Sequence, residues 1–182
     1  MVLLIVGVSG VGKTTIGAQV ARELGIPFFD ADDFHPASNI ERMKSGIPLD
    51  DDDRQPWIET LAKQLSYWQK ASGAVLACSA LKKSYREILE AQCDERPLWL
   101  FLHAPKSVLA SRLAARKGHF FDQRLLHTQL DELEAPDDGW LIDASQSEEE
   151  IVGEVLSRIR ADESCSTWER GNVGSELEKT IS

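Results

Sequence analysis

The sequence predicts an α/β fold in which helices cover both faces of a parallel five-stranded sheet. Short apolar runs of strand length alternate with stretches of helical periodicity, which is typical of such sheets. A glycine-rich loop follows the first apolar run at once. The 182 residues suit one domain with a single sizeable core.

The expected strands are residues 2–6, 26–29, 74–78, 98–102 and 140–142. The first is a continuous apolar run, as expected for a strand that is buried on both faces. The expected helices are residues 13–24, 36–45, 58–68, 82–92, 105 to about 116, 123–134 and 147–160. Gly46 ends the second helix and is followed by a loop over 47–53, while Pro105 suits the first turn of the fifth.

The remaining sequence suggests how the chain is organised and where it acts. From Ala161 onward it is polar and has no apolar period, so we expect one domain over 1–160 and a disordered tail over 161–182. No apolar run approaches the ~20 residues of a membrane span, which predicts a cytoplasmic protein. A net charge of −10 disfavours nucleic acid and anionic membranes as partners.

The loop after the first strand matches the pattern G-x-x-x-x-G-K-[ST], with Gly7, Val8, Ser9, Gly10, Val11, Gly12, Lys13 and Thr14 in order. Glycines let several backbone N–H groups point at one phosphate, and the following helix adds its positive end. The Lys13 ammonium would reach the β- and γ-phosphates, and the Thr14 hydroxyl would bind Mg²⁺. We therefore predict a P-loop NTPase fold that uses ATP and Mg²⁺, with Thr15 also in the ATP site.

Asp30, Asp32 and Asp33 follow the second strand, where the sheet would face the γ-phosphate. Acids in loops are often only solvated or capping residues. Here a carboxylate could accept the proton of an attacking hydroxyl or hold a water ligand of the metal. We assign Asp32 to the acceptor hydroxyl as a catalytic residue and Asp30 to the metal site beside Thr14, and the division between the two acids stays open.

Two further groups of side chains could bind a substrate. Arg54 follows the acidic run 50–53 in what would be the first turn of a helix; it either binds an acceptor carboxylate or offsets its acidic neighbours. Arg112, Arg116, Lys117 and His119 form either a solvated helix end or, as we favour, part of a lid over about 116–126. In the lid, Arg116 would be catalytic and Arg112 would bind ATP.

Three segments of the sequence resemble the gluconokinases of the P-loop type. The first is Asp30-Ala-Asp-Asp-Phe-His-Pro36, continued by Asn39-Ile40, Met43, Gly46-Ile-Pro-Leu49, Asp51-Asp-Asp-Arg54 and Pro56-Trp57. The second is Cys78-Ser-Ala-Leu-Lys-Lys-Ser-Tyr-Arg86, and the third is Leu113-Ala-Ala-Arg-Lys-Gly-His-Phe120. The resemblance covers about residues 2–160 and departs from the family at Ala31, where Gly is expected, and at Thr128, where Ser is expected.

The resemblance implies ATP-dependent phosphorylation of D-gluconate on its 6-hydroxyl by a protein that forms a homodimer. It also implies a fold close to shikimate and nucleoside monophosphate kinases. The acceptor-binding residues would be Asp32, His35, Arg54, Ser79, Lys82 and His119, with Arg86 as a further candidate for the carboxylate. A kinase for another small acid, such as shikimate, is the alternative; a nucleotide switch would need a water-positioning Gln and a base-recognition motif that the sequence lacks.

Overall fold

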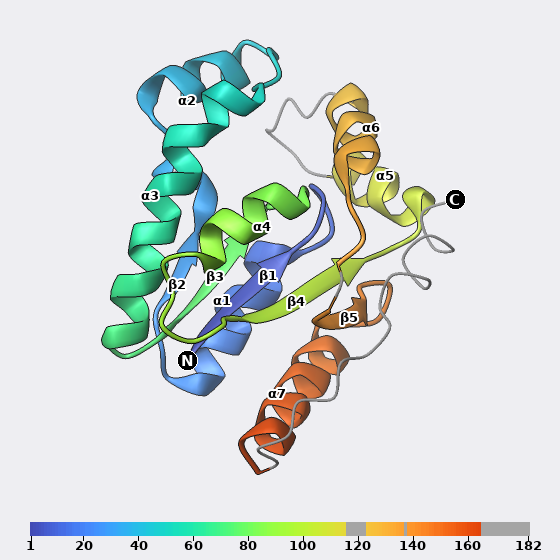
Figure 1. The fold of residues 1–182 in the computed structure, drawn as a ribbon. Coiled ribbons are helices and arrows are strands. Elements are labelled where there is room, and N and C mark those ends of the chain that lie inside the picture. Colours follow the sequence, from blue (N-terminus) through green and yellow to red (C-terminus); the bar gives the residue numbers. More distant parts are fainter. Residues whose placement is uncertain (116–122, 137, 165–182) are drawn as a thin grey trace.

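The computed structural model describes residues 1–115, 123–136 and 138–164. Five parallel strands in these residues form one sheet in the order β2-β3-β1-β4-β5 (Figure 1). They are β1 (Val2–Val6), β2 (Phe28–Asp30), β3 (Ala74–Cys78), β4 (Leu98–His103) and β5 (Trp140–Asp143). The predicted parallel five-stranded sheet is therefore confirmed.

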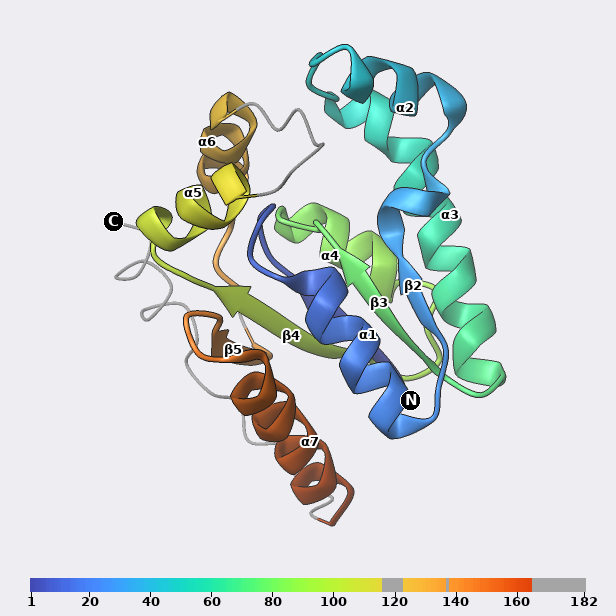
Figure 2. The ribbon, with the colours of Figure 1, turned by 180° about the vertical axis from the view of Figure 1, so that it is seen from behind.

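Helices cover both faces of this sheet (Figures 1 and 2). On one face lie α1 (Lys13–Leu24) and α7 (Glu148–Ser164), and on the other lie α3 (Asp51–Lys70) and α4 (Lys83–Glu90). Alternate residues of β1 enter the two cores, because successive side chains of a strand point to opposite faces: Leu3 and Ile5 pack with α1 and α7, whereas Leu4 packs with α3 and α4. Burial on both faces explains why β1 has no polar residue.

The remaining helices lie toward the carboxyl end of the sheet. They are α2 (Ala37–Lys44), α5 (Lys106–Ala115) and α6 (Gln123–Glu132). In both views α2 and α6 stand on opposite sides of the loop that leaves β1 (Figures 1 and 2). None of the helices in the described residues is both long and apolar enough to cross a membrane.

The third helix begins earlier than the sequence pattern predicts. Apolar periodicity predicts a helix only from residue 58, after a loop to Asp53, but α3 begins at Asp51, where the acidic run suits the first turn of a helix. Asp50 and Asp53 form a reciprocal cap, in which each side chain accepts a hydrogen bond from the backbone N–H of the other, at 2.8 and 3.1 Å. The helix continues through Pro56, which removes one backbone donor, and Trp57 and Ile58 are buried directly after it.

Two other segments differ from the expectation. A single 3₁₀ turn, η1 (Ala31–Phe34), follows β2, because the Asp30 side chain accepts a hydrogen bond from the Asp32 N–H at 3.1 Å and turns the chain. The last helix extends four residues beyond its predicted end and includes the start of the expected tail. Arg116, Lys117, His119 and residues 165–182 lie outside the described residues.

Candidate active site

The loop between β1 and α1 approaches its neighbours so closely that glycine is required. A Cβ on Gly7 would lie 2.6 Å from the carbonyl oxygen of Leu102, at the end of β4. Gly12, which precedes α1, has a φ of +106°, a conformation that residues with side chains rarely adopt. The backbone of this loop thus curls at the positive end of a 12-residue helix, as an anion-binding loop requires.

Side chains from the start of α1 and the end of β2 bring a cation and two oxygen ligands together. The Lys13 ammonium lies 3.2 Å from the carbonyl oxygen of Val8, so it folds back over the loop. The Thr14 hydroxyl donates to a carboxylate oxygen of Asp30 at 2.8 Å. Hydroxyl and carboxylate oxygens are ligands that Mg²⁺ prefers, and Mg²⁺ keeps several waters when few protein groups bind it. These two residues therefore fit the predicted metal.

A cavity of about 400 Å³ opens beside this loop. It is lined by most of the predicted site residues, namely Ser9, Gly10, Gly12, Lys13, Thr14, Asp30, Asp32, His35, Arg54 and Ser79. Trp57, Leu81, Tyr85, Thr128, Gln129 and Glu132 complete much of its wall. The structure thus brings the nucleotide loop and four of the predicted acceptor residues, Asp32, His35, Arg54 and Ser79, to one cavity.

Several predicted residues do not line this cavity, among them Arg112, Lys82 and Thr15. Arg112, on α5, donates to the carbonyl oxygen of Val11 at 3.3 Å and so supports the nucleotide loop. Lys82 precedes α4 and forms an ion pair with Asp51 at 2.5 Å. Thr15 is an exposed residue of α1 next to Thr14.

Asp32 has an environment that favours its neutral form more than water does. Its pKa is raised, first because surrounding protein atoms reduce its hydration and second because the Asp30 carboxylate is close; the Lys13 ammonium opposes this rise. The residue as a whole is solvent-exposed, so the loss of hydration is partial. A raised pKa makes a carboxylate a better proton acceptor.

His35 lies flat against Trp57, with ring centres 4.5 Å apart and planes 10° from parallel. Its Nδ1 lies 3.4 Å from the side-chain nitrogen of the buried Asn39. Burial, followed by the nearby charge of Arg54, lowers the pKa of His35 to about 4. The imidazole is therefore neutral at physiological pH and can act there as a hydrogen-bonding group but carries no charge.

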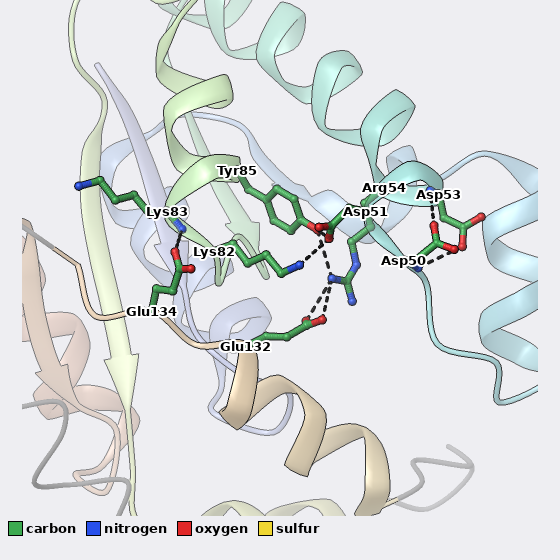
Figure 3. A network of polar contacts seen from close by, with 9 residues as sticks. All are labelled: Asp50, Asp51, Asp53, Arg54, Lys82, Lys83, Tyr85, Glu132 and Glu134. Atoms are coloured by element: carbon green, nitrogen blue, oxygen red, sulfur yellow. Dashed lines mark hydrogen bonds and ion pairs between the residues drawn. The ribbon is translucent and has the colours of Figure 1, made fainter.

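Arg54 crosses from α3 to the neighbouring helices (Figure 3). Its Nη1 donates to the Tyr85 hydroxyl at 3.3 Å and to the two carboxylate oxygens of Glu132 at 3.1 and 3.2 Å. The ion-pair partner of Arg54 belongs to α6, and the Arg54 side chain is only 18% exposed. The pKa of the neighbouring Asp51 is lowered first by the hydrogen bonds that it accepts from Lys82 and Tyr85, and the charge of Arg54 also contributes. Asp53 instead pairs with Arg42.

Polar residues that the sequence did not predict as site residues also line this cavity, among them Tyr85, Gln129 and Glu132. Tyr85 donates to Asp51, which also holds Lys82 (Figure 3). Gln129 accepts a hydrogen bond from the Ser9 N–H at 2.7 Å, so α6 reaches the nucleotide loop. Tyr85 stood in the second segment of the resemblance, and Gln129 follows Thr128, where the sequence departs from the family. No spacing in the sequence signals that α6 would meet residues 78 and 120 positions away.

Arg86, a further candidate for the carboxylate, is placed elsewhere. It is 7% exposed, and it donates to the carbonyl oxygens of Leu81 and Ala135 at 2.8 and 3.4 Å. Its donors thus satisfy backbone groups, which is a structural role. Arg86 does not line the cavity described above.

Comparisons with known proteins agree with this fold. Residues 9–160 match the family model described as "Shikimate kinase". A "Probable gluconokinase" of Dictyostelium discoideum is 41% identical over 88% of this chain and 86% of its own, and a "Gluconokinase" of Gluconobacter oxydans is 47% identical over 75% and 76%. The crystal structure of a gluconokinase from Sinorhizobium meliloti, 40% identical, superposes with a TM-score of 0.80 and covers 88% of this chain and 91% of its own.

Identity at this level over most of the chain is far above what a shared fold alone requires. The strand order, the nucleotide loop and the cavity beside it are those of a P-loop kinase that uses a nucleotide and a small-molecule substrate. The chain belongs to the gluconokinase family of P-loop kinases, with the shikimate kinases as more distant relatives.

Proposed function

We propose that the protein transfers the γ-phosphoryl group of ATP to the 6-hydroxyl of D-gluconate, giving 6-phospho-D-gluconate and ADP. The observation that carries this proposal is the pairing of groups in one cavity. The Asp32 carboxylate and the Arg54 guanidinium both line the space beside the nucleotide loop, where a sugar acid would have to present a hydroxyl and a carboxylate. The names of the relatives point to the same acceptor.

The nucleotide would be held by the loop over 7–15. Backbone N–H groups bind the phosphate oxygens, and Lys13 leaves the Val8 carbonyl to neutralise charge on the transferring group. Arg112 stabilises the loop by donating a hydrogen bond to the carbonyl oxygen of Val11. Arg116, predicted to act on the transferring phosphoryl group, lies outside the described residues and stays a prediction.

The metal would be held by Thr14 directly and by Asp30 through water. Their mutual hydrogen bond keeps both oxygens in place before a metal binds. When bound, Mg²⁺ would neutralise charge on the β- and γ-phosphate oxygens. Asp30 also fixes the turn that presents Asp32, since it accepts the Asp32 N–H.

Asp32 would accept the proton of the acceptor hydroxyl. As the hydroxyl oxygen forms its bond to the γ-phosphorus, the bond between this phosphorus and the β–γ bridging oxygen breaks, and the proton passes to the carboxylate. At the other end of the acceptor, Arg54 would bind the carboxylate, and the neutral His35 and Ser79 would bind hydroxyl groups of the sugar chain. Lys82 would add positive charge nearby, and His119, outside the described residues, stays a predicted contact.

An ADP-forming coupled assay with gluconate, with shikimate and without acceptor tests the proposal. We expect turnover with gluconate only, and mass spectrometry should locate the phosphate on the 6-hydroxyl. Turnover with shikimate alone would support the alternative kinase, and equal ADP formation in all three samples would reject a kinase of either acid. The homodimer and the cytoplasmic location implied by the sequence also stay predictions, and light scattering in solution tests the first.

A further inference from the structure

Glu132 is an acid of the cavity for which the proposed reaction has no use. It is the last residue of α6 and lines the cavity beside Arg54. The Glu132 and Arg54 side chains are only 24% and 18% exposed, so water screens their charges less than those of a surface pair. An anionic acceptor would therefore meet a negative charge directly beside the cation that attracts it.

The contact between Glu132 and Arg54 uses only part of the guanidinium (Figure 3). Both carboxylate oxygens approach a single nitrogen, Nη1, which also donates to Tyr85. Within residues 1–115, 123–136 and 138–164, every hydrogen bond of the Arg54 side chain uses this nitrogen. A carboxylate binds arginine best through two parallel bonds to two nitrogens. An incoming carboxylate could thus gain a bond that Glu132 lacks.

The other charges around Arg54 are already paired. Asp51 accepts hydrogen bonds from both Lys82 and Tyr85, and it faces the same hydroxyl that Arg54 contacts. Arg54, Lys82, Asp51 and Glu132 together carry no net charge. Replacing one carboxylate on Arg54 by another would preserve this balance and leave Arg54 oriented by Tyr85, whereas simple loss of Glu132 would leave a half-buried cation unpaired.

We propose that Glu132 sets the affinity and selectivity for acidic acceptors by occupying Arg54 in the free protein until the carboxylate of the acceptor replaces it. The inference rests on the proposed function, because it assumes a sugar acid as acceptor. Displacing Glu132 costs the bonds to Nη1, and only a ligand with its own carboxylate restores them. A neutral polyol of the same length cannot do so, so Glu132 discriminates against it.

Steady-state kinetics and calorimetry of Glu132→Gln test this exchange. We expect the KM and Kd for gluconate to fall about 3- to 10-fold, as for a partly screened ion pair that no longer has to be broken. The KM for ATP should not change. Glucitol, the polyol without a carboxylate, should inhibit the variant more strongly than it inhibits the wild type, because it no longer has to break the bonds between Glu132 and Arg54. Glu132→Ala should shift gluconate in the same direction, which excludes an effect of the amide.

Asp131→Asn is the matched control, because it removes the same charge from an exposed neighbouring position on α6. Asp131→Asn should keep the wild-type KM and Kd for gluconate. If these constants fall as much as in Glu132→Gln, the effect comes from the overall negative charge near the site, and the proposal is overturned. A raised KM for gluconate in both Glu132 variants would mean that Glu132 positions Arg54 for the acceptor. Unchanged KM and Kd for gluconate would mean that the Glu132–Arg54 ion pair does not affect acceptor binding. Either result also refutes the exchange. Failure of the wild type to phosphorylate gluconate would instead refute the proposed function, and it is seen before any variant is made.

Discussion

The two sides of the cavity are built in opposite ways. The nucleotide side is continuous in sequence: residues 7–15 form the loop and the first turn of α1, and Lys13 bonds a carbonyl only five residues away. The acceptor side is assembled from distant segments, since Arg54 meets Tyr85 and Glu132 across 31 and 78 residues. Local chemistry thus specifies the first side, whereas the packing of α3, α4 and α6 creates the second.

The largest effect should come from Asp32, which stands where the two sides meet. Asp32→Asn keeps the size of the side chain but removes the proton acceptor, so we expect turnover to fall by about 10²- to 10⁴-fold. ATP binding, measured by calorimetry, should persist. Loss of ATP binding in Asp32→Asn, together with normal binding in Asp30→Asn, would show that the two acids have exchanged roles.

The raised pKa of Asp32 adds a pH signature to the same variant. A base must be deprotonated to act, so kcat/KM of the wild type should decline as the pH falls through the raised pKa of Asp32. This acidic limb should be absent from the residual activity of Asp32→Asn. If the activity of Asp32→Asn falls at acidic pH in the same way as that of the wild type, this pH dependence belongs to a titratable group other than Asp32.

Lys13→Ala tests whether the nucleotide side works as a separate unit. Removing the ammonium takes away charge that stabilises the transferring phosphoryl group, and we expect turnover to fall on the order of 10²-fold or more. Gluconate binding, which depends on the acceptor side, should stay near normal by calorimetry. Near-normal turnover in the folded variant would contradict the assignment of Lys13.

Arg54→Lys tests the acceptor side in the same manner. Lysine keeps the charge but offers no planar fork, so the KM for gluconate should rise by an amount equivalent to about 1.5–3 kcal/mol, the range for hydrogen bonds to charged groups. The KM for ATP should change little. A KM for gluconate within about twofold of wild type, the scale of an exposed pair, would transfer the carboxylate to Lys82 or His119.

The smallest expected effect concerns stability near His35. Its pKa is about 4 in the folded protein against an ordinary 6.5, so the unfolded chain binds more protons between these values, and stability is lost as the pH falls from 6.5 towards 4. The full shift corresponds to about 3.4 kcal/mol, and partial exposure reduces this to about 1–2 kcal/mol.

His35→Phe keeps a flat ring against Trp57 but cannot titrate. Chemical denaturation across this pH range should show that the variant lacks this part of the pH dependence. Parallel stability curves for the two proteins would mean that His35 takes up its proton as readily in the folded state as in the unfolded chain.

The contrast between the nucleotide side and the acceptor side also explains which parts of the fold and of the site the sequence alone could predict. The order of strands and helices follows from apolar periodicity, and the nucleotide loop follows from a pattern of contiguous residues. The early start of α3 depends on a cap between Asp50 and Asp53, which the acidic run contains but apolar periodicity does not reveal. Glu132 is an ordinary helical acid until the fold brings α6 to Arg54, so its position depends on tertiary packing that no local signal encodes.

A hydrogen bond between the turn η1 and α3 affects which acids fit the cavity. The buried Trp57, on α3, donates its indole N–H to the carbonyl oxygen of Ala31 at 2.7 Å, next to Asp32. Arg54 lies one helical turn earlier on the same helix. If α3 shifts as a rigid body, Asp32 and Arg54 move together. The distance between their side chains then stays constant and selects acceptors by the length of their carbon chain. A five-carbon acid whose carboxylate binds Arg54 should then hold its terminal hydroxyl too far from Asp32 to react. Comparing the turnover of five- and six-carbon sugar acids tests this selection by length.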